Sequence, residues 1–457
     1  MRAILVATVL FTFITTVIFV FSTHPLAPAA VWTSCAEPLA LRRSRGGYIL
    51  VLRYSGQQGA GVQALSSLQQ WISNLDLPMK VVEPFIQNSV LGIHPAKKAN
   101  AKSVRFGEMF DLDNFNDVSR RKGLAEMIPW SVYRASAQGQ AAVFVNMVAI
   151  DGHTSFSAPT ISWQDGGSGR CKVTEITGPD KTSVSLCQGR RAEAYWKFAN
   201  THTLSSEEVY NSILGGLDPS NITLIFSLWR GPWQVEKEKN VLHQELEYKD
   251  SQNLLNSAIA YQNKFLAAPE SRYVAVMIRA EHSILQFLAK RSKNTSKDLE
   301  KCMDELVKET DAAMKAVGAS GLFVTSDVGY FGSGSWNRTI SSPEKGDVAD
   351  VERRVKRTVE RLYAGRQGWT FEEWERSFVE ASGGVDERGY VAALQRVVAT
   401  DRKAACLVLL GGGIFHELSL KQYLYNTNNR THPCCVRMVC MQRKYRESLT
   451  SMLEKAS

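Results

Sequence analysis

The side chains best suited to chemistry stand where predicted strands end in the second half of the chain. Arg279 closes the apolar run at residues 273–279, and Glu281 begins the helical pattern that follows. A guanidinium at a helix N-terminus matches a diphosphate, because it donates paired hydrogen bonds and the nearby backbone amides add a favourable field. We therefore predict that Arg279 binds a phosphate, with pairing to a carboxylate such as Glu281 as the alternative.

A second strand end offers groups for a ribose or a base. The predicted strand at residues 321–327 ends in Ser326 and Asp327. The carboxylate of Asp327 can accept hydrogen bonds from ribose hydroxyls or base amines. The alternative is that Asp327 only caps the turn that follows.

A third predicted strand, residues 405–410, runs into Gly411, Gly412 and Gly413 and then into Phe415. Glycines after a strand let the backbone approach a phosphate, since no Cβ stands in the way, and the Phe415 ring can lie against a base. Relief of crowding is the alternative for the glycines, and core packing is the alternative for Phe415. All three strand ends fall in one half of the chain, which favours a nucleotide-diphosphate site.

The first predicted strand, residues 48–55, leads into a loop that contains Gly59 and Gly61 and opens a helix. Residues 59–64 match the G-x-G-x-x-[GA] pattern of dinucleotide-binding loops, and Glu83 lies near the position of the acidic residue that binds a ribose. Four residues, 55–58, separate Tyr54 from Gly59, whereas in the pattern the strand runs straight into its first glycine. We interpret this segment as a glycine-rich loop, and the sequence does not identify its ligand.

Asp111 and Asp113 form a D-x-D pattern. In metal-dependent glycosyltransferases such paired carboxylates hold a divalent ion on the diphosphate. The pattern is only three residues long, and the alternative is a turn with one capping aspartate.

Strands and helices alternate along the chain, which predicts an α/β fold with parallel sheets. Two blocks of this alternation predict two Rossmann-like domains that face a cleft, at residues 47–235 and 236–457. Ligands of such sheets bind beyond the carboxyl ends of the strands, where the residues above stand. The polar, glycine-rich stretch at residues 162–183 is predicted to be a loop insertion. The other predicted strands are 80–85, 140–150 and 222–229, and the predicted helices are 62–75, 281–291, 297–318, 347–363 and 386–400.

The N-terminus predicts a membrane anchor. Residues 3–22 carry no charge, and a helix of about twenty apolar residues rises about 30 Å, enough to cross a bilayer. We expect residues 1–2 in the cytoplasm, a stem at residues 23–46 and a luminal remainder, as in a single-pass type II protein of the Golgi or endoplasmic reticulum. Cleavage as a signal peptide near residues 25–30 is the alternative.

The cysteines and glycosylation sequons agree with a secretory lumen. Cys171 and Cys187 flank a polar stretch and can close a loop, and Cys434, Cys435 and Cys440 cluster near the C-terminus. The spacing of this cluster does not match a zinc site, so we predict disulfides and no metal centre. The N-x-[ST] sequons lie at Asn221, Asn294, Asn337 and Asn429.

The overall charge speaks against nucleic acid as a partner. The chain has 457 residues and a formal charge of +9, from 54 lysines and arginines against 45 acidic residues. This excess is spread over the length without a long basic tract, unlike the basic patches of nucleic-acid-binding proteins. It suits a partner that carries phosphate or sulfate.

Several segments resemble motifs of the protein O-fucosyltransferase superfamily. The segment "YVAVMIRAEHSI" resembles the family's strand that leads into a histidine-x-arginine motif. The segments "GLFVTSDVGYFGSGS" and "AACLVLLGGGIFHE" resemble its two later strand-loop motifs, and "VRFGEMFDLDNF" resembles its segment that ends in Phe-Asp and an aromatic residue. The segment "RYSGQQGAGVQALSSLQQW" stands where the family has its N-terminal glycine-rich loop. The resemblance covers most of residues 47–420 and rests on the order and spacing of these motifs.

The resemblance implies a GT-B-like fold and inverting transfer from GDP-fucose to a protein or glycan hydroxyl, with no cofactor and no required metal. It implies that Arg279 holds the leaving diphosphate, and that Asp111 and Asp113 have structural or acceptor-side roles. Arg279 and Glu281 are the catalytic candidates. The nucleotide-sugar-binding candidates are Gly59, Gly61, Arg279, Ser326, Asp327, Gly412, Gly413 and Phe415.

The chain departs from the family where Met277 replaces the histidine of the motif. Inverting transfer needs a general base on the acceptor hydroxyl, and the candidates are Glu281, Glu83 and Asp111. One alternative is a catalytically inactive luminal protein that binds a glycan or nucleotide on the same fold. Another is an NAD(P)-dependent oxidoreductase built on Gly59–Ala64 and Glu83. A sulfotransferase is a weaker alternative.

Overall fold

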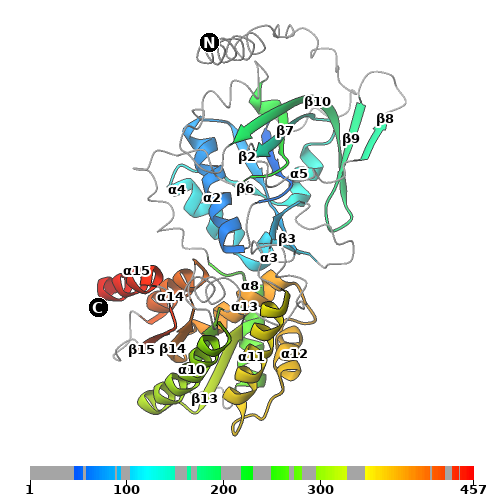
Figure 1. Ribbon diagram of the computed structural model, residues 1–457. Helices are drawn as coiled ribbons and strands as arrows, with labels where there is room; N and C mark the ends of the chain where they lie inside the picture. Colours follow the sequence, from blue (N-terminus) through cyan, green and yellow to red (C-terminus); the bar gives the residue numbers. More distant parts are fainter. Residues whose placement is uncertain are drawn as a thin grey trace, which may run out of the picture.

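The computed structural model is shown in Figure 1. The structure describes residues 46–54, 58–87, 90–93, 103–149, 162–165, 172–196, 218–229, 249–266, 272–279, 295–326, 345–411, 414–427, 435–441 and 443–456. Within these ranges no helix is both long enough and apolar enough to cross a membrane. The predicted anchor at residues 3–22 lies outside them.

The first sheet has eight strands in the order β6-β2-β1-β11-β7-β10-β9-β8. Neighbouring strands from β6 to β10 are parallel, whereas β9 and β8 add to the edge in antiparallel orientation. A small antiparallel sheet, β4-β3-β5, stands beside it. The bounds are β1 Gly47–Val51, β2 Met79–Val82, β3 Phe85–Gln87, β4 Val90–Gly92, β5 Val104–Arg105, β6 Met127–Ile128, β7 Ala141–Ala149, β8 Ser162–Asp165, β9 Lys172–Thr177, β10 Ser183–Trp196 and β11 Ile222–Phe226.

The second sheet has four parallel strands in the order β13-β12-β14-β15. Its strands come from the second half of the chain and lie in the lower half of the molecule in Figure 1. Together the two sheets confirm the predicted α/β fold with parallel sheets. The bounds are β12 Tyr273–Ile278, β13 Gly321–Ser326, β14 Ala404–Leu410 and β15 Cys435–Val439.

Helices fill the connections and cover the sheets. In the second sheet, α10 packs against β12, β14 and β15, while α13 packs against β12, β13 and β14. The bounds are α2 Gln58–Asn74, α3 Phe106–Met109, α4 Leu112–Arg121, α5 Trp130–Ser136, η2 Pro219–Asn221, α8 Gln252–Phe265, α10 Thr295–Val317, α11 Lys345–Tyr363, α12 Phe371–Ala381, α13 Arg388–Ala399, α14 Ile414–Thr427 and α15 Arg443–Ala456.

The central strands are buried along their whole length. Every residue of β1, β11 and β12 is buried, as expected of parallel strands that are covered on both faces. In α11 the predicted apolar face is confirmed, because Val351, Val355, Val359 and Leu362 are all buried. Continuous apolar runs and helical periodicity therefore placed these elements correctly.

The prediction of a loop at residues 162–183 is wrong. This stretch contains β8 and β9, and β9 pairs with the start of β10. The pair buries Ile176, Val184 and Leu186 on one face only. A strand with one solvated face carries many polar residues, so polarity was no evidence against a strand here.

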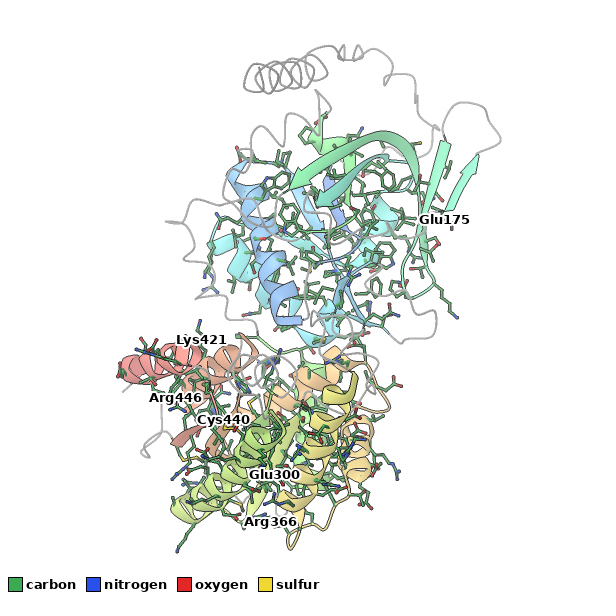
Figure 2. All side chains as sticks on the ribbon, in the orientation of Figure 1. Glu175, Glu300, Arg366, Lys421, Cys440 and Arg446 are labelled. Carbon is green, nitrogen blue, oxygen red and sulfur yellow. A yellow bond between two sulfur atoms is a disulfide. The ribbon has the colours of Figure 1, made fainter. Side chains whose placement is uncertain are left out.

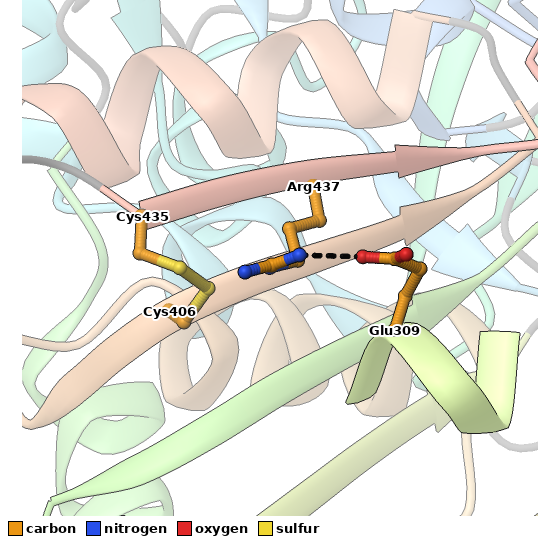
Figure 3. Close-up of a disulfide and its surroundings, with 4 residues drawn as sticks. All are labelled: Glu309, Cys406, Cys435 and Arg437. Atoms are coloured by element: carbon orange, nitrogen blue, oxygen red, sulfur yellow. Dashed lines mark hydrogen bonds and ion pairs between the residues drawn. A yellow bond between two sulfur atoms is a disulfide. The ribbon is translucent and has the colours of Figure 1, made fainter. Parts of the chain in front are cut away.

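Disulfides fix the last strand of the second sheet. Cys406 of β14 bonds to Cys435 of β15, and the two residues stand directly opposite in the strand register. Figure 3 shows this disulfide beside Arg437, whose side chain forms an ion pair of 2.6 Å with Glu309 of α10. Cys302 of α10 bonds to Cys440, which directly follows β15. The predicted use of Cys435 and Cys440 in disulfides is confirmed.

The predicted pairing of Cys187 is confirmed only in part. Cys187 is disulfide-bonded. Its expected partner, Cys171, lies outside the described residues, as does Cys434.

Candidate functional site

Three of the predicted strand ends meet at one edge of the second sheet. Ile278 of β12 stands opposite Ser326 of β13 on one side and opposite Leu410 of β14 on the other. The backbone amide of Arg279 donates a hydrogen bond of 3.0 Å to the Leu410 carbonyl. The register therefore places Arg279, Ser326 and Gly411 at the same carboxyl edge.

This edge is the topological switch point of the sheet. The chain enters at β12, adds β13 on one side and then crosses over to add β14 and β15 on the other. In open α/β sheets the crevice between the two strands where the order reverses is the usual place of ligand binding. Here the strand order reverses between β12 and β14, and Arg279 and Gly411 directly follow the ends of these two strands.

Gly411 makes the turn from β14 toward helix α14. Its φ of +83° lies in the left-handed region that favours glycine, and its amide donates a hydrogen bond of 3.3 Å to the Val439 carbonyl. Helix α14 begins three residues later, at Ile414. A helix N-terminus presents unpaired amides and a partial positive charge, so the switch point combines a guanidinium with a helix start.

His416, a residue that sequence reasoning missed, belongs to this edge. Its side chain is 1% exposed and its ring hydrogen-bonds to the Gly411 backbone. Burial and the nearby Arg279 charge lower the pKa of His416 to about 3, so its imidazole is neutral. A single histidine at an otherwise apolar helix start gave no periodic signal. Its position directly after the glycines of the predicted site was the one signal that could have identified it.

The glycine-containing helix of the first half reaches this region. Gly59 and Gly61 lie within the first turns of α2, which contacts α14. A Cβ on Gly61 would stand 3.0 Å from the Leu91 side chain. In Figure 2, Lys421 of α14 lies where the upper and lower parts of the molecule meet. Glu175 of β9 lies at the right-hand edge of the upper part. The prediction that Gly59 and Gly61 lie in a loop is wrong, because both belong to helix α2, which begins at Gln58.

Other predicted site residues lie outside the described part of the chain. These are Glu281, Asp327, Gly412 and Gly413, and the Phe415 ring, although Phe415 itself is the second residue of α14. Of the sequons, Asn221 is exposed at the end of η2. The other three, Asn294, Asn337 and Asn429, lie outside the described residues.

Two acidic candidates have structural partners. The Glu83 carboxylate is 3% exposed and accepts hydrogen bonds from the Gly107 amide (2.7 Å) and the Trp130 amide (3.2 Å), which stand at the starts of α3 and α5. Burial raises the pKa of Glu83, and the two amide bonds oppose that shift. Asp111 caps α4 by accepting a 2.9 Å bond from the Asn114 amide. Among the described residues, no three His, Cys, Asp or Glu side chains stand close enough to hold a metal ion.

The fold defines an α/β protein in which the candidate residues Arg279 and Gly411 stand at the switch point of a parallel sheet. Compared with known proteins, the chain matches no family model and no curated protein. Among solved structures it is similar to a crystal structure of POFUT1 in complex with GDP, with 12% sequence identity and a TM-score of 0.46. That similarity covers 87% of this chain and 99% of the POFUT1 chain.

Proposed function

We propose that the chain is a fucosyltransferase-like glycosyltransferase that transfers fucose from GDP-fucose to a hydroxyl of a protein or glycan. The observation that carries this proposal is the placement of Arg279 beside Gly411 at the switch point of the second sheet. A guanidinium, a glycine turn and a helix N-terminus together suit a nucleotide diphosphate. The sequence motifs that resemble the O-fucosyltransferase superfamily narrow the proposed donor to GDP-fucose.

In the proposed reaction the acceptor hydroxyl attacks the anomeric carbon of the sugar. The bond from that carbon to the diphosphate oxygen breaks, GDP leaves with the bonding electrons, and the anomeric configuration inverts. Arg279 offsets the negative charge that grows on the diphosphate, and no metal ion takes part. Glu281 is the proposed base, because the carboxylates of Glu83 and Asp111 already accept backbone amides.

The proposal extends to the architecture and the compartment. Residues 236–457 form the nucleotide-sugar side of a GT-B-like pair of domains, and residues 47–235 form the acceptor side. Residues 3–22 anchor a type II protein in the Golgi or endoplasmic reticulum membrane. The uncharged N-terminal segment, the sequons and the disulfides support this placement.

A second candidate is a luminal protein on the same fold that binds nucleotide or glycan without catalysis. Met277, where the resembled family has a histidine, is 1% exposed and lies within the core strand β12. It supplies no polar group to the proposed site. The NAD(P) alternative receives less support, since both Glu83 oxygens are held by backbone amides.

The test is nucleotide binding by the full-length protein, measured as the rise in Tm with GDP, GDP-fucose, UDP and NAD. A ligand that binds only the folded state raises Tm by mass action. We expect GDP and GDP-fucose to raise Tm, and Arg279→Ala to weaken their binding by about 100-fold, as expected when a charged hydrogen-bonding partner is removed.

Arg272 provides the matched control. It is exposed and stands directly before the same strand that Arg279 follows, so Arg272→Ala removes an arginine from the opposite end of β12. That variant should bind nucleotide like the wild type. Equal binding by Arg279→Ala and wild type would overturn the site. Binding that depends on Arg279 without fucose transfer to any acceptor would favour the second candidate.

A further inference from the structure

The imidazole of His416 is only half satisfied. Its ring hydrogen-bonds to the Gly411 backbone, while Nδ1 is buried and has no hydrogen-bond partner among the residues that the structure describes. The bond to Gly411 is therefore made by Nε2, which donates to the carbonyl. A buried polar atom without a partner is destabilising, and such atoms are rare enough in native proteins to require an explanation.

The protonation state of His416 decides what kind of group Nδ1 can bind. Burial and the Arg279 charge keep the imidazole neutral at physiological pH, because they hold its pKa near 3. In a neutral imidazole whose Nε2 carries the proton, Nδ1 has a free lone pair and is an acceptor. It therefore needs a hydroxyl or N–H donor and does not suit a phosphate oxygen.

The position of His416 indicates that a bound ligand supplies this hydrogen-bond donor. The residue is the third of α14, whose start follows β14 at the switch point, and it lies close enough to Arg279 to feel its charge. We propose that His416 is a ligand-contacting residue of this site, and that its Nδ1 accepts a hydrogen bond from a hydroxyl or N–H group of the bound nucleotide sugar. This inference rests on the proposed function. In this arrangement Arg279 binds the diphosphate, and His416 accepts a hydrogen bond from a neutral hydroxyl or N–H group beside it.

A purely structural role is the competing explanation. In that case the ring only fixes the turn at Gly411 through Nε2, and the unpaired Nδ1 has no purpose. The two roles use different nitrogens, so two amide substitutions separate them. The oxygen of asparagine can take the place of Nδ1, whereas the nitrogen of glutamine reaches the place of Nε2.

The experiment measures GDP and GDP-fucose affinity by calorimetry, and Tm without ligand, for full-length wild type, His416→Gln and His416→Asn. We expect His416→Gln to keep its Tm within a few degrees but to bind GDP-fucose about tenfold more weakly, because one hydrogen bond to the ligand is lost. His416→Asn should lower Tm and keep the affinity within about threefold. A loss confined to GDP-fucose places the donor group on the sugar, and a loss shared by GDP places it on the nucleotide.

The outcomes separate this inference from the proposed function. If His416→Gln binds both ligands like the wild type while Arg279→Ala does not bind, the inference is wrong and the proposed site stands. If His416→Asn weakens affinity as much as His416→Gln, the ring acts only through the Gly411 turn. If the wild type binds neither ligand, both the proposed site and the proposed role of His416 are wrong.

Discussion

Arg279 is placed by its backbone. Its amide completes the hydrogen bonding between β12 and β14, so the residue stands at the switch point of the sheet. The apolar run before it is buried without a break, which makes slippage of the strand by one residue costly. The sequence supplied both facts, because a parallel strand reads as a continuous apolar run and the residue after it lies at the ligand edge.

Glu375 gives a test of the electrostatics that is independent of the site. It lies on α12 with one carboxylate oxygen buried and without a partner among the described residues. Burial raises the pKa of Glu375 to about 7, with Lys356 opposing the shift and the charges of Glu372 and Glu352 adding to it. The folded state therefore holds a proton on Glu375 that the unfolded chain releases near its ordinary pKa of about 4.3.

The raised pKa of Glu375 makes stability fall as pH rises. Below about pH 4 both states are protonated and Glu375 has no effect on stability, whereas between about pH 4 and 7 folding becomes less favourable as pH rises. Glu375→Gln mimics the protonated side chain, so it should raise the unfolding free energy by about 1–2 kcal/mol at pH 8 and by almost nothing at pH 4. Chemical denaturation at the two pH values measures this.

Glu372 is the matched control for that experiment. It is an exposed glutamate on the same helix, and Glu372→Gln should change stability by less than about 0.5 kcal/mol at either pH. An equal gain at pH 4 and pH 8 for Glu375→Gln would contradict the electrostatic explanation.

At the scale of elements, Gly411 joins the end of β14 to α14. Its left-handed φ makes any other residue strained by about 1 kcal/mol. Gly411→Ala should therefore lower stability by about that amount and also weaken GDP binding, because the turn sets the start of α14 against Arg279. Denaturation and nucleotide titration of the same variant measure the two effects.

Gly383 separates backbone strain from site geometry. Its φ is also left-handed, at +66°, and a Cβ there would meet nothing within 4 Å. Gly383→Ala should lose a similar amount of stability and leave GDP affinity unchanged. If both variants bind GDP like the wild type, the turn at Gly411 has no part in binding.

The elements that sequence reasoning missed share a physical cause. Strands β8 and β9 carry polar residues because they extend the sheet at an edge with one solvated face, and α14 lacks the apolar periodicity that marked α11. The contact between α14 and α2 joins segments that are more than 300 residues apart in the sequence. No local pattern specifies such a contact, so the packing of α14 against α2 could not be predicted from the sequence.

At the scale of the whole molecule, the segment after residue 248 ties the two halves together. The Asp111 amide donates to the Lys249 carbonyl (2.9 Å), and the Ser251 amide donates to the Met109 carbonyl (3.0 Å). Between them, Asp250 forms an ion pair with Arg396 of α13. Contacts of α3 with α8 and of α13 with β3 lie at the same junction. The two halves of the chain, which form the two sides of the proposed cleft, are therefore joined by the contacts of residues 249–251.

The Asp250–Arg396 pair should dominate the stability of this junction. Its side chains are only 8% and 12% exposed, so removal of one partner leaves a buried charge without compensation. Asp250→Asn should lower the unfolding free energy by about 3–5 kcal/mol, and the double variant with Arg396→Met should recover part of that loss. The exposed pair Lys264–Glu380 is the control, and Glu380→Gln should cost less than about 1 kcal/mol. A double-mutant cycle by chemical denaturation measures the coupling, and equal costs for Asp250→Asn and Glu380→Gln would show that the junction is not held by this pair.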